Sequence, residues 1–145
     1  MIKIICAGKI KENYLKELIA DYTKRINKFH KLEIIEIKDN DDIKKETYEL
    51  LKVINSKDYN IALCIDGKSS NSIEFSKHID ELFNYNSTIA FIIGGSNGLE
   101  AEIINICNET LSFSKFTFPH GLFRGILLEQ IYRSFKIINN ETYHK

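Results

Sequence analysis

The chain has 145 residues, within the usual range for one domain, so residues 1–145 are expected to form a single unit. Lysine and arginine together number 20, as do aspartate and glutamate, and this balance excludes a strong general attraction to polyanions; any contact with nucleic acid must come from local basic patches. Three cysteines, Cys6, Cys64 and Cys107, lie far apart in apolar runs, which indicates reduced thiols in a cytoplasmic protein rather than a disulfide framework or a zinc site. No apolar stretch has the length of a signal peptide core or a membrane span, so neither export nor a membrane partner is expected.

Short apolar runs alternate with amphipathic stretches in the order expected of βαβ units. Four runs have the composition of strands: Ile2–Ala7, Leu32–Ile37, Ile61–Ile65 and Thr88–Ile93. Three of them are apolar almost without alternation, as in a parallel sheet that is covered on both faces. Between them, apolar residues recur at helical spacing in 15–26, 43–54 and 71–83, and Asn71 and Glu74 are placed for a capping box. This order predicts an α/β fold with a central, mainly parallel sheet flanked by helices.

Loops that leave the carboxyl ends of parallel strands are the usual place for a ligand, and two such loops contain glycine. Asp66–Lys68, after the third predicted strand, is interpreted as a tight turn. Gly94–Gly98 joins the fourth strand to a helix expected near Leu99, and it matches neither the dinucleotide nor the phosphate-loop pattern. Its paired glycines would let a ligand approach the backbone closely, although a glycine-rich turn needs no ligand.

An aromatic segment, Phe113–Phe118, precedes the last predicted helix. Its alternation favours a strand, but a segment so rich in phenylalanine could also wrap an apolar ligand. The helix is expected from about His120, with Pro119 at its start, where a fixed φ and a missing N–H are tolerated. His120 is either a helix-terminal histidine without a role or a general base or donor to an anionic group.

The last predicted helix carries a broad apolar stripe with an arginine in it. The stripe consists of Leu127, Leu128, Ile131, Tyr132, Phe135 and Ile138. Arg124 shares this face, whereas Arg133 and Lys136 point the other way, toward water. Arg124 therefore either snorkels at the first turn or pairs with a carboxylate elsewhere, and its position one turn from His120 makes the two a site-like pair.

Several long motifs resemble the bacterial ribosomal RNA large subunit methyltransferase H family. They are Ile4–Lys11, Glu33–Ile37, Ile93–Leu99, Leu111–His120, Leu128–Arg133 and the terminal Tyr143–Lys145. The resemblance spans the chain and implies a SPOUT-class methyltransferase: a homodimer that uses S-adenosylmethionine without a metal and has a deep C-terminal trefoil knot. It further implies methylation of N3 of a pseudouridine in 23S rRNA, with the assembled 70S ribosome as the partner.

The same resemblance implies particular site residues. The S-adenosylmethionine pocket would be formed by Leu63, Gly94, Phe113, Ser114, Lys115, Phe116, Thr117 and Phe118. The target base would be surrounded by His120, Arg124, Tyr143 and His144, with Arg124 stabilising the deprotonated ring or a nearby phosphate. His120 and His144 are comparable candidates for the base that removes the N3 proton, and unaided loss of the proton is the third route. Lys115, Arg133 and the basic first helix are the expected phosphate contacts.

Three alternatives remain open. The chain could be a catalytically idle ribosome- or RNA-binding module of the same fold, or a SPOUT methyltransferase that acts on another RNA. The broad stripe of the last helix is interpreted as a dimer interface, with a monomer core as the alternative. Gly121 and Gly125 replace the larger residues usual in the family, and each could cost its helix about 1 kcal/mol relative to alanine.

Overall fold

The computed structural model describes residues 1–145, and its centre is one five-stranded sheet with strand order β2-β1-β4-β3-β5. Every pair of neighbouring strands is parallel. In chain order the elements are β1 (Ile2–Ala7), α1 (Asn13–Ile26), β2 (Leu32–Ile37), α2 (Ile43–Val53), β3 (Tyr59–Ser69), α3 (Ser72–Phe83), β4 (Ile89–Ile93), α4 (Ala101–Ile106), β5 (Glu109–Ser112) and α5 (His120–Ile138). The predicted α/β architecture with a parallel sheet is confirmed; the threading of a trefoil knot stays a prediction.

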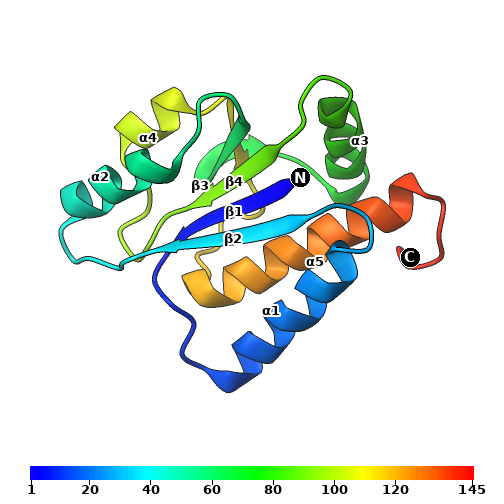
Figure 1. The fold of residues 1–145 in the computed structure, drawn as a ribbon, viewed down its shortest axis with the longest axis horizontal. Coiled ribbons are helices and arrows are strands. Elements are labelled where there is room, and N and C mark those ends of the chain that lie inside the picture. The colour runs from blue at the N-terminus through cyan, green and yellow to red at the C-terminus, as the bar shows by residue number, and fades with distance from the viewer.

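Helices cover both faces of the sheet (Figure 1). α1, α3 and α5 pack on one face around a core that includes Ile4 of β1, whereas α2 and α4 pack on the other face around a core that includes Ile5. Successive residues of a strand point to opposite faces, so each strand between two helical layers must be apolar along its whole length. This explains why β1 and β4 have almost no polar residues. No helix is both long and apolar enough to cross a membrane.

The broad apolar stripe of α5 belongs to the core of this chain. Leu127, Leu128 and Ile131 are 0% exposed and Phe135 is 3% exposed. The stripe is wide because α5 packs on the sheet and is also flanked by α1 and α3. Its interpretation as a dimer interface is therefore wrong for these four residues, which are covered by the chain itself.

Two glycines bring α1 close to α5. A Cβ on Gly125 would lie 2.6 Å from Cδ2 of Leu18, and one on Gly121 would lie 3.1 Å from Cδ1 of Ile10. The glycines are one turn apart and so face the same neighbour. Glycine at these two positions, in place of the larger residues usual in the family, thus has a packing role: it makes room for α1 and for the loop before α1.

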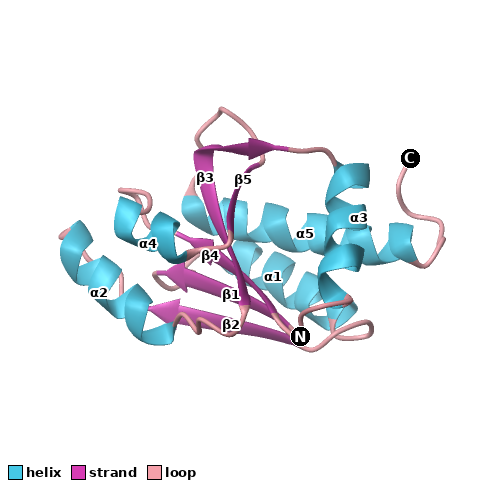
Figure 2. Ribbon diagram, turned by 90° about the horizontal axis from the view of Figure 1, so that it is seen from above, coloured by secondary structure: helices cyan, strands magenta, loops and turns pink.

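β3 is longer than expected, because Asp66–Lys68 continues the strand instead of turning away from it. Leu111 of β5 pairs with both Leu63 and Lys68, so β3 is irregular between these two residues. A Cβ on Gly67 would lie 2.7 Å from the carbonyl carbon of Leu111. Gly67 is needed for this close approach of two backbones, and its interpretation as part of a tight turn is wrong. Figure 2 shows β3 and β5 side by side at one edge of the sheet.

Phe113–Phe118 is not a strand; β5 ends at Ser112. Serine side chains turn the chain at this point. The Ser112 hydroxyl donates to the Ser114 carbonyl oxygen at 3.1 Å, and the Ser114 hydroxyl accepts the N–H of Phe116 at 3.0 Å. Such local bonds compete with the strand ladder for backbone groups, so the segment leaves the sheet as a loop.

Candidate functional site

The register of the sheet brings the predicted donor-binding segments to one place. Leu63 of β3 pairs with Ile93 of β4 on one side and with Leu111 of β5 on the other. Gly94 directly follows Ile93, and Phe113 lies two residues beyond Leu111. Leu63, Gly94 and the start of the aromatic segment therefore meet where β4 and β5 end beside the middle of the longer β3, and the carboxyl ends of parallel strands are where such sheets usually bind ligands.

The glycine loop after β4 is a tight turn. Gly98 donates its N–H to the carbonyl oxygen of Gly95 at 3.0 Å, and its φ is +73°. A Cβ on Gly94 would lie 2.4 Å from the carbonyl oxygen of Gly98. Gly94 must therefore be a glycine for the turn to close, and its backbone is left uncovered by any side chain of its own.

In the aromatic segment, the rings of Phe113 and Phe118 are packed against the protein, whereas the side chains of residues 115–117 between them are exposed. Phe113 packs edge-on against Phe75 and Phe123, with ring centroids 5.8 and 5.3 Å apart, and Phe118 stacks on Phe123 at 6.3 Å. In contrast, Phe116 is 79% exposed, and Lys115 and Thr117 are exposed as well. The packed rings anchor the two ends of the segment, and the side chains between them are available to a ligand or partner.

A cavity of about 240 Å³ opens beside this segment, between the start of α3 and α5. Its lining combines three aromatic rings with hydroxyl and amide groups: Ser70, Asn71, Ser72, Phe75, Leu111, Ser112, Phe113, Phe118, Ile126 and Gln130. Apolar walls with a few polar groups are typical of a small-molecule site. The cavity includes two of the predicted donor-binding residues, Phe113 and Phe118, but not Leu63 or Gly94.

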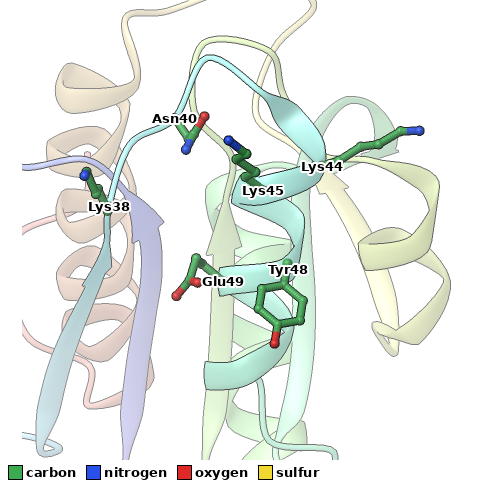
Figure 3. Close-up of a pocket in the computed structure, with 6 residues that line it drawn as sticks. All are labelled: Lys38, Asn40, Lys44, Lys45, Tyr48 and Glu49. Atoms are coloured by element: carbon green, nitrogen blue, oxygen red, sulfur yellow. The ribbon is translucent and has the colours of Figure 1, made fainter.

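A second cavity, of about 520 Å³, lies between the end of β2 and α2 (Figure 3). It is lined by Lys38, Asn40, Lys44, Lys45, Tyr48 and Glu49, with Tyr48 as its one apolar contributor. Figure 3 shows the Lys44 side chain pointing away from those of Lys38 and Lys45. The lining is typical of a hydrated charged surface rather than of a nucleoside pocket.

Arg124 lies inside the protein. Its side chain is 2% exposed, Nη1 donates to Oε2 of Glu36 at 2.7 Å, and Nη2 donates to the carbonyl oxygen of Gly8 at 3.1 Å. The alternative of an ion pair with a distant carboxylate is therefore correct, and the Arg124 side chain is enclosed by the protein in this arrangement. The physical reason is the direction of its side chain: Arg124 shares the sheet-facing side of α5 and reaches the ends of β1 and β2.

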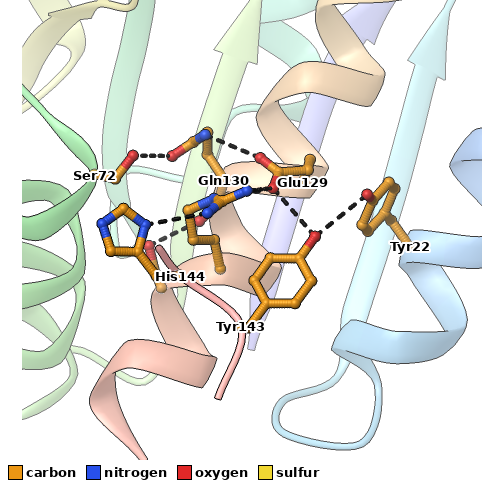
Figure 4. Close-up of polar contacts among 8 residues, drawn as sticks. Tyr22, Ser72, Glu129, Gln130, Tyr143 and His144 are labelled. Carbon is orange, nitrogen blue, oxygen red and sulfur yellow. Dashed lines mark hydrogen bonds and ion pairs between the residues drawn. The ribbon is translucent and has the colours of Figure 1, made fainter. Parts of the chain in front are cut away.

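Tyr143 and His144 lie elsewhere, folded back along the outer side of α5 (Figure 4). The Tyr143 hydroxyl donates to Oε1 of Glu129 at 3.2 Å and is 3.5 Å from the hydroxyl of Tyr22. The His144 Nδ1 is 3.1 Å from Nη1 of Arg133. Burial, the Tyr22 hydroxyl and the negative charge of Glu129 together raise the pKa of Tyr143. The tail is thus held by α1 and α5 of its own chain, and the structure does not bring it together with His120 and Arg124.

The basic residues expected to contact phosphates differ in their exposure and in whether an acidic group already pairs with them. Lys115 is exposed, and so are Lys16 and Lys24 of α1. Arg133, in contrast, donates from Nε to Glu129 at 3.0 Å and also contacts His144. Lys136 pairs with Glu141. Arg133 and Lys136 lie outside the core, as predicted, but they are only partly exposed because acidic groups of α5 and the tail pair with them.

Sequence reasoning missed two acidic residues that organise this end of the sheet, Glu36 and Glu46. Glu36 follows an apolar run on β2, and the only signal for it was the need of Arg124 for a partner. Glu46 is 3% exposed on α2, and its acidic side chain gave no sign of burial because charged residues in helices usually face water. No group of three or more His, Cys, Asp or Glu side chains could hold a metal ion.

The parallel α/β sheet, with its glycine loop beside the aromatic segment, is compatible with a SPOUT methyltransferase, and residues 1–144 match the family model described as "Predicted SPOUT methyltransferase", which shows that class. The chain is 50% identical to Ribosomal RNA large subunit methyltransferase H of Fusobacterium nucleatum subsp. nucleatum, over 99% of this chain and 99% of that protein. It is 48% identical to the protein of the same name from Clostridium botulinum, with the same coverage of both chains. The chain therefore belongs to the ribosomal RNA large subunit methyltransferase H family of SPOUT methyltransferases.

A solved structure agrees with this fold. A tRNA (m1G37) methyltransferase from Aquifex aeolicus superimposes with a TM-score of 0.52 at 15% identity, covering 91% of this chain and 69% of that chain. At this identity the likeness concerns the fold alone.

Proposed function

We propose that this protein uses S-adenosylmethionine to methylate N3 of a pseudouridine in 23S rRNA on the assembled ribosome. The observation that carries the proposal is the full-length identity of about half to relatives named Ribosomal RNA large subunit methyltransferase H. The meeting of Leu63, Gly94 and the aromatic segment at one sheet edge supports the choice of methyl donor. The resemblance of the sequence motifs is the basis for N3 and for pseudouridine.

The chain's own residues fit an adenosine-containing donor. The buried backbone of Gly94 would offer hydrogen bonds, while Leu63 and the rings of Phe113 and Phe118 would supply apolar contacts. Because no phosphate is present in such a donor, the lack of a phosphate-loop pattern is no obstacle. When bound, S-adenosylmethionine supplies an electrophilic methyl group.

The protein must also hold the RNA base and remove its N3 proton. His120, at the first turn of α5, and His144, in the tail, remain the candidate bases. Arg124 is proposed to act indirectly, since its contacts with Glu36 and the Gly8 carbonyl hold the loop that follows β1 near the site. Exposed Lys115 and the lysines of α1 would contact phosphates.

We propose further that the protein works as a homodimer in which the Tyr143–Lys145 tail completes the partner's site. Within one chain the tail lies against Glu129 and Arg133, away from His120. A catalytic role for Tyr143 or His144 beside His120 therefore requires either a second copy or release of the tail.

Mass spectrometry of rRNA nucleosides from a strain that lacks the gene tests the reaction and the substrate together. Loss of one methylpseudouridine from 23S rRNA, restored by the wild-type gene, is the expected result. Loss of a methyl group from tRNA instead would favour a SPOUT enzyme acting on another RNA. Calorimetry with S-adenosylmethionine distinguishes the enzyme from a catalytically idle RNA-binding module, because a module that has lost its activity should not bind the donor.

A further inference from the structure

A buried carboxylate of α2 holds the glycine loop at the candidate donor site. Oε1 of Glu46 accepts the backbone N–H of Gly95 at 3.1 Å, and Oε2 lies 3.5 Å from the backbone nitrogen of Asn40. The residue is 3% exposed, and no lysine, arginine or histidine forms an ion pair with it. Burying a carboxylate without a cation is costly, so its backbone donors have to compensate for the lost water.

The contact between Glu46 and the loop is close. A Cβ on Gly95 would lie 2.9 Å from both carboxylate oxygens of Glu46. The absence of a side chain at Gly95 is therefore what allows the carboxylate to reach the backbone N–H. Glu46 and Gly95 are complementary in shape as well as in hydrogen bonding.

The planarity of the peptide bond extends this contact to Gly94. The Gly95 N–H and the Gly94 carbonyl belong to one trans peptide unit and point in opposite directions. Because Glu46 binds the N–H from the α2 side, the Gly94 carbonyl is directed away from α2. Gly94 is buried, yet neither its N–H nor its carbonyl has a hydrogen-bond partner in the protein. Buried backbone groups are almost always bonded, so these two are free for a ligand.

We propose that Glu46 is a positioning residue for the methyl donor, which it serves by fixing the peptide unit between Gly94 and Gly95. Glu46 does not touch the donor; it orients the Gly94 carbonyl toward an amino or hydroxyl group of the donor. This inference rests on the proposed function, since it takes the loop to be part of the donor site.

The test compares donor binding by full-length wild-type protein, Glu46→Gln and Glu46→Leu, measured by titration calorimetry with S-adenosylmethionine. Glu46→Leu removes both acceptors and is expected to raise Kd about tenfold, a change of about 1.4 kcal/mol in binding free energy at 25 °C. Glu46→Gln keeps one acceptor for Gly95 and should lie between Glu46→Leu and the wild type. With ribosomes as substrate, KM for the donor should rise while kcat at saturating donor stays close to that of the wild type.

Two matched variants control for charge and for packing. Glu49→Gln makes the same chemical change at a half-exposed residue of α2, and Thr47→Val changes the adjacent buried polar residue. Both should bind the donor as the wild type does. If Glu46→Gln, folded by circular dichroism, bound the donor as tightly as the wild type, the positioning role would be refuted. If the wild type itself bound no donor, the proposed function would fail, and this inference with it.

Discussion

Arg124 and Glu36 form an ion pair whose two members differ sharply in their access to water. The guanidinium is 2% exposed and the carboxylate 34% exposed, with 2.7 Å between Nη1 and Oε2. Water can therefore solvate Glu36 if its partner is lost, whereas Arg124 has no such substitute. The pair also joins α5 to β2 through two residues that are 88 positions apart in the chain.

This asymmetry predicts that the fold is destabilised strongly when Glu36 is removed, because the buried Arg124 guanidinium then has no counter-charge. Glu36→Leu leaves a buried guanidinium without a counter-charge and should lower the free energy of unfolding by about 3 kcal/mol. Adding Arg124→Met to the same chain should recover part of this loss. Equilibrium unfolding in urea measures both values. A double variant as unstable as the sum of its single changes would show that the two residues are not coupled.

At Gly125 of α5, the size of a substituted side chain should decide how much stability is lost. At Gly125, alanine improves helix propensity by about 1 kcal/mol, and it displaces only a δ-methyl of Leu18, so the net change should be small. Gly125→Leu has no room and should cost about 2–3 kcal/mol. Thermal unfolding measures the difference. Equal stability of the two variants would mean that α1 does not pack closely here.

Gly67 should not tolerate even a methyl group. The nearest atoms to its ideal Cβ are backbone atoms of Leu111, which cannot rotate away as a side chain could. Gly67→Ala is expected to cost about 2–3 kcal/mol in unfolding free energy and to weaken donor binding, because β3 and β5 border the candidate site. For stability alone, Gly98→Asn is the control: a Cβ there meets no atom within 4 Å, and asparagine tolerates the positive φ of 73°.

Two cysteines predict a loss of stability at alkaline pH. Burial raises the pKa of Cys6 and of Cys107 from 9.0 to about 11. Above pH 9 the thiols of the unfolded chain ionise while those of the folded chain stay protonated, so the unfolding free energy should fall between about pH 9 and pH 11 and be unaffected by these groups below pH 9. Urea unfolding across this range, compared with Cys6→Ala and Cys107→Ala, measures the effect. An identical pH profile for wild type and variants would contradict it.

The sequence predicted four of the five strands and missed β5 (Glu109–Ser112), which has only four residues. β1 and β4 were the clearest because they lie between two helical layers, and burial on both faces requires an almost unbroken apolar run. Local patterns failed where the answer depended on a distant segment. The residues around Gly67 predict a turn because none of them indicates the contact with Leu111. The alternation in Phe113–Phe118 favours a strand over a segment that wraps a ligand, because alternation does not reveal the serine hydrogen bonds that turn the chain. The helical spacing of Arg124 showed that it needed a partner, but only the order of the strands identifies Glu36. The burial of Glu46 likewise follows from the packing of α2 against the glycine loop.

The tail contact also provides the chain with an optical reporter. Tyr143 lies 4.9 Å from Tyr132, ring to ring, and Tyr132 lies 6.0 Å from Tyr22. The chain has no tryptophan to mask tyrosine emission or near-ultraviolet dichroism. Movement of the last three residues away from α1 and α5 would change the surroundings of this tyrosine cluster, so the position of the tail can be followed in solution without attaching a label.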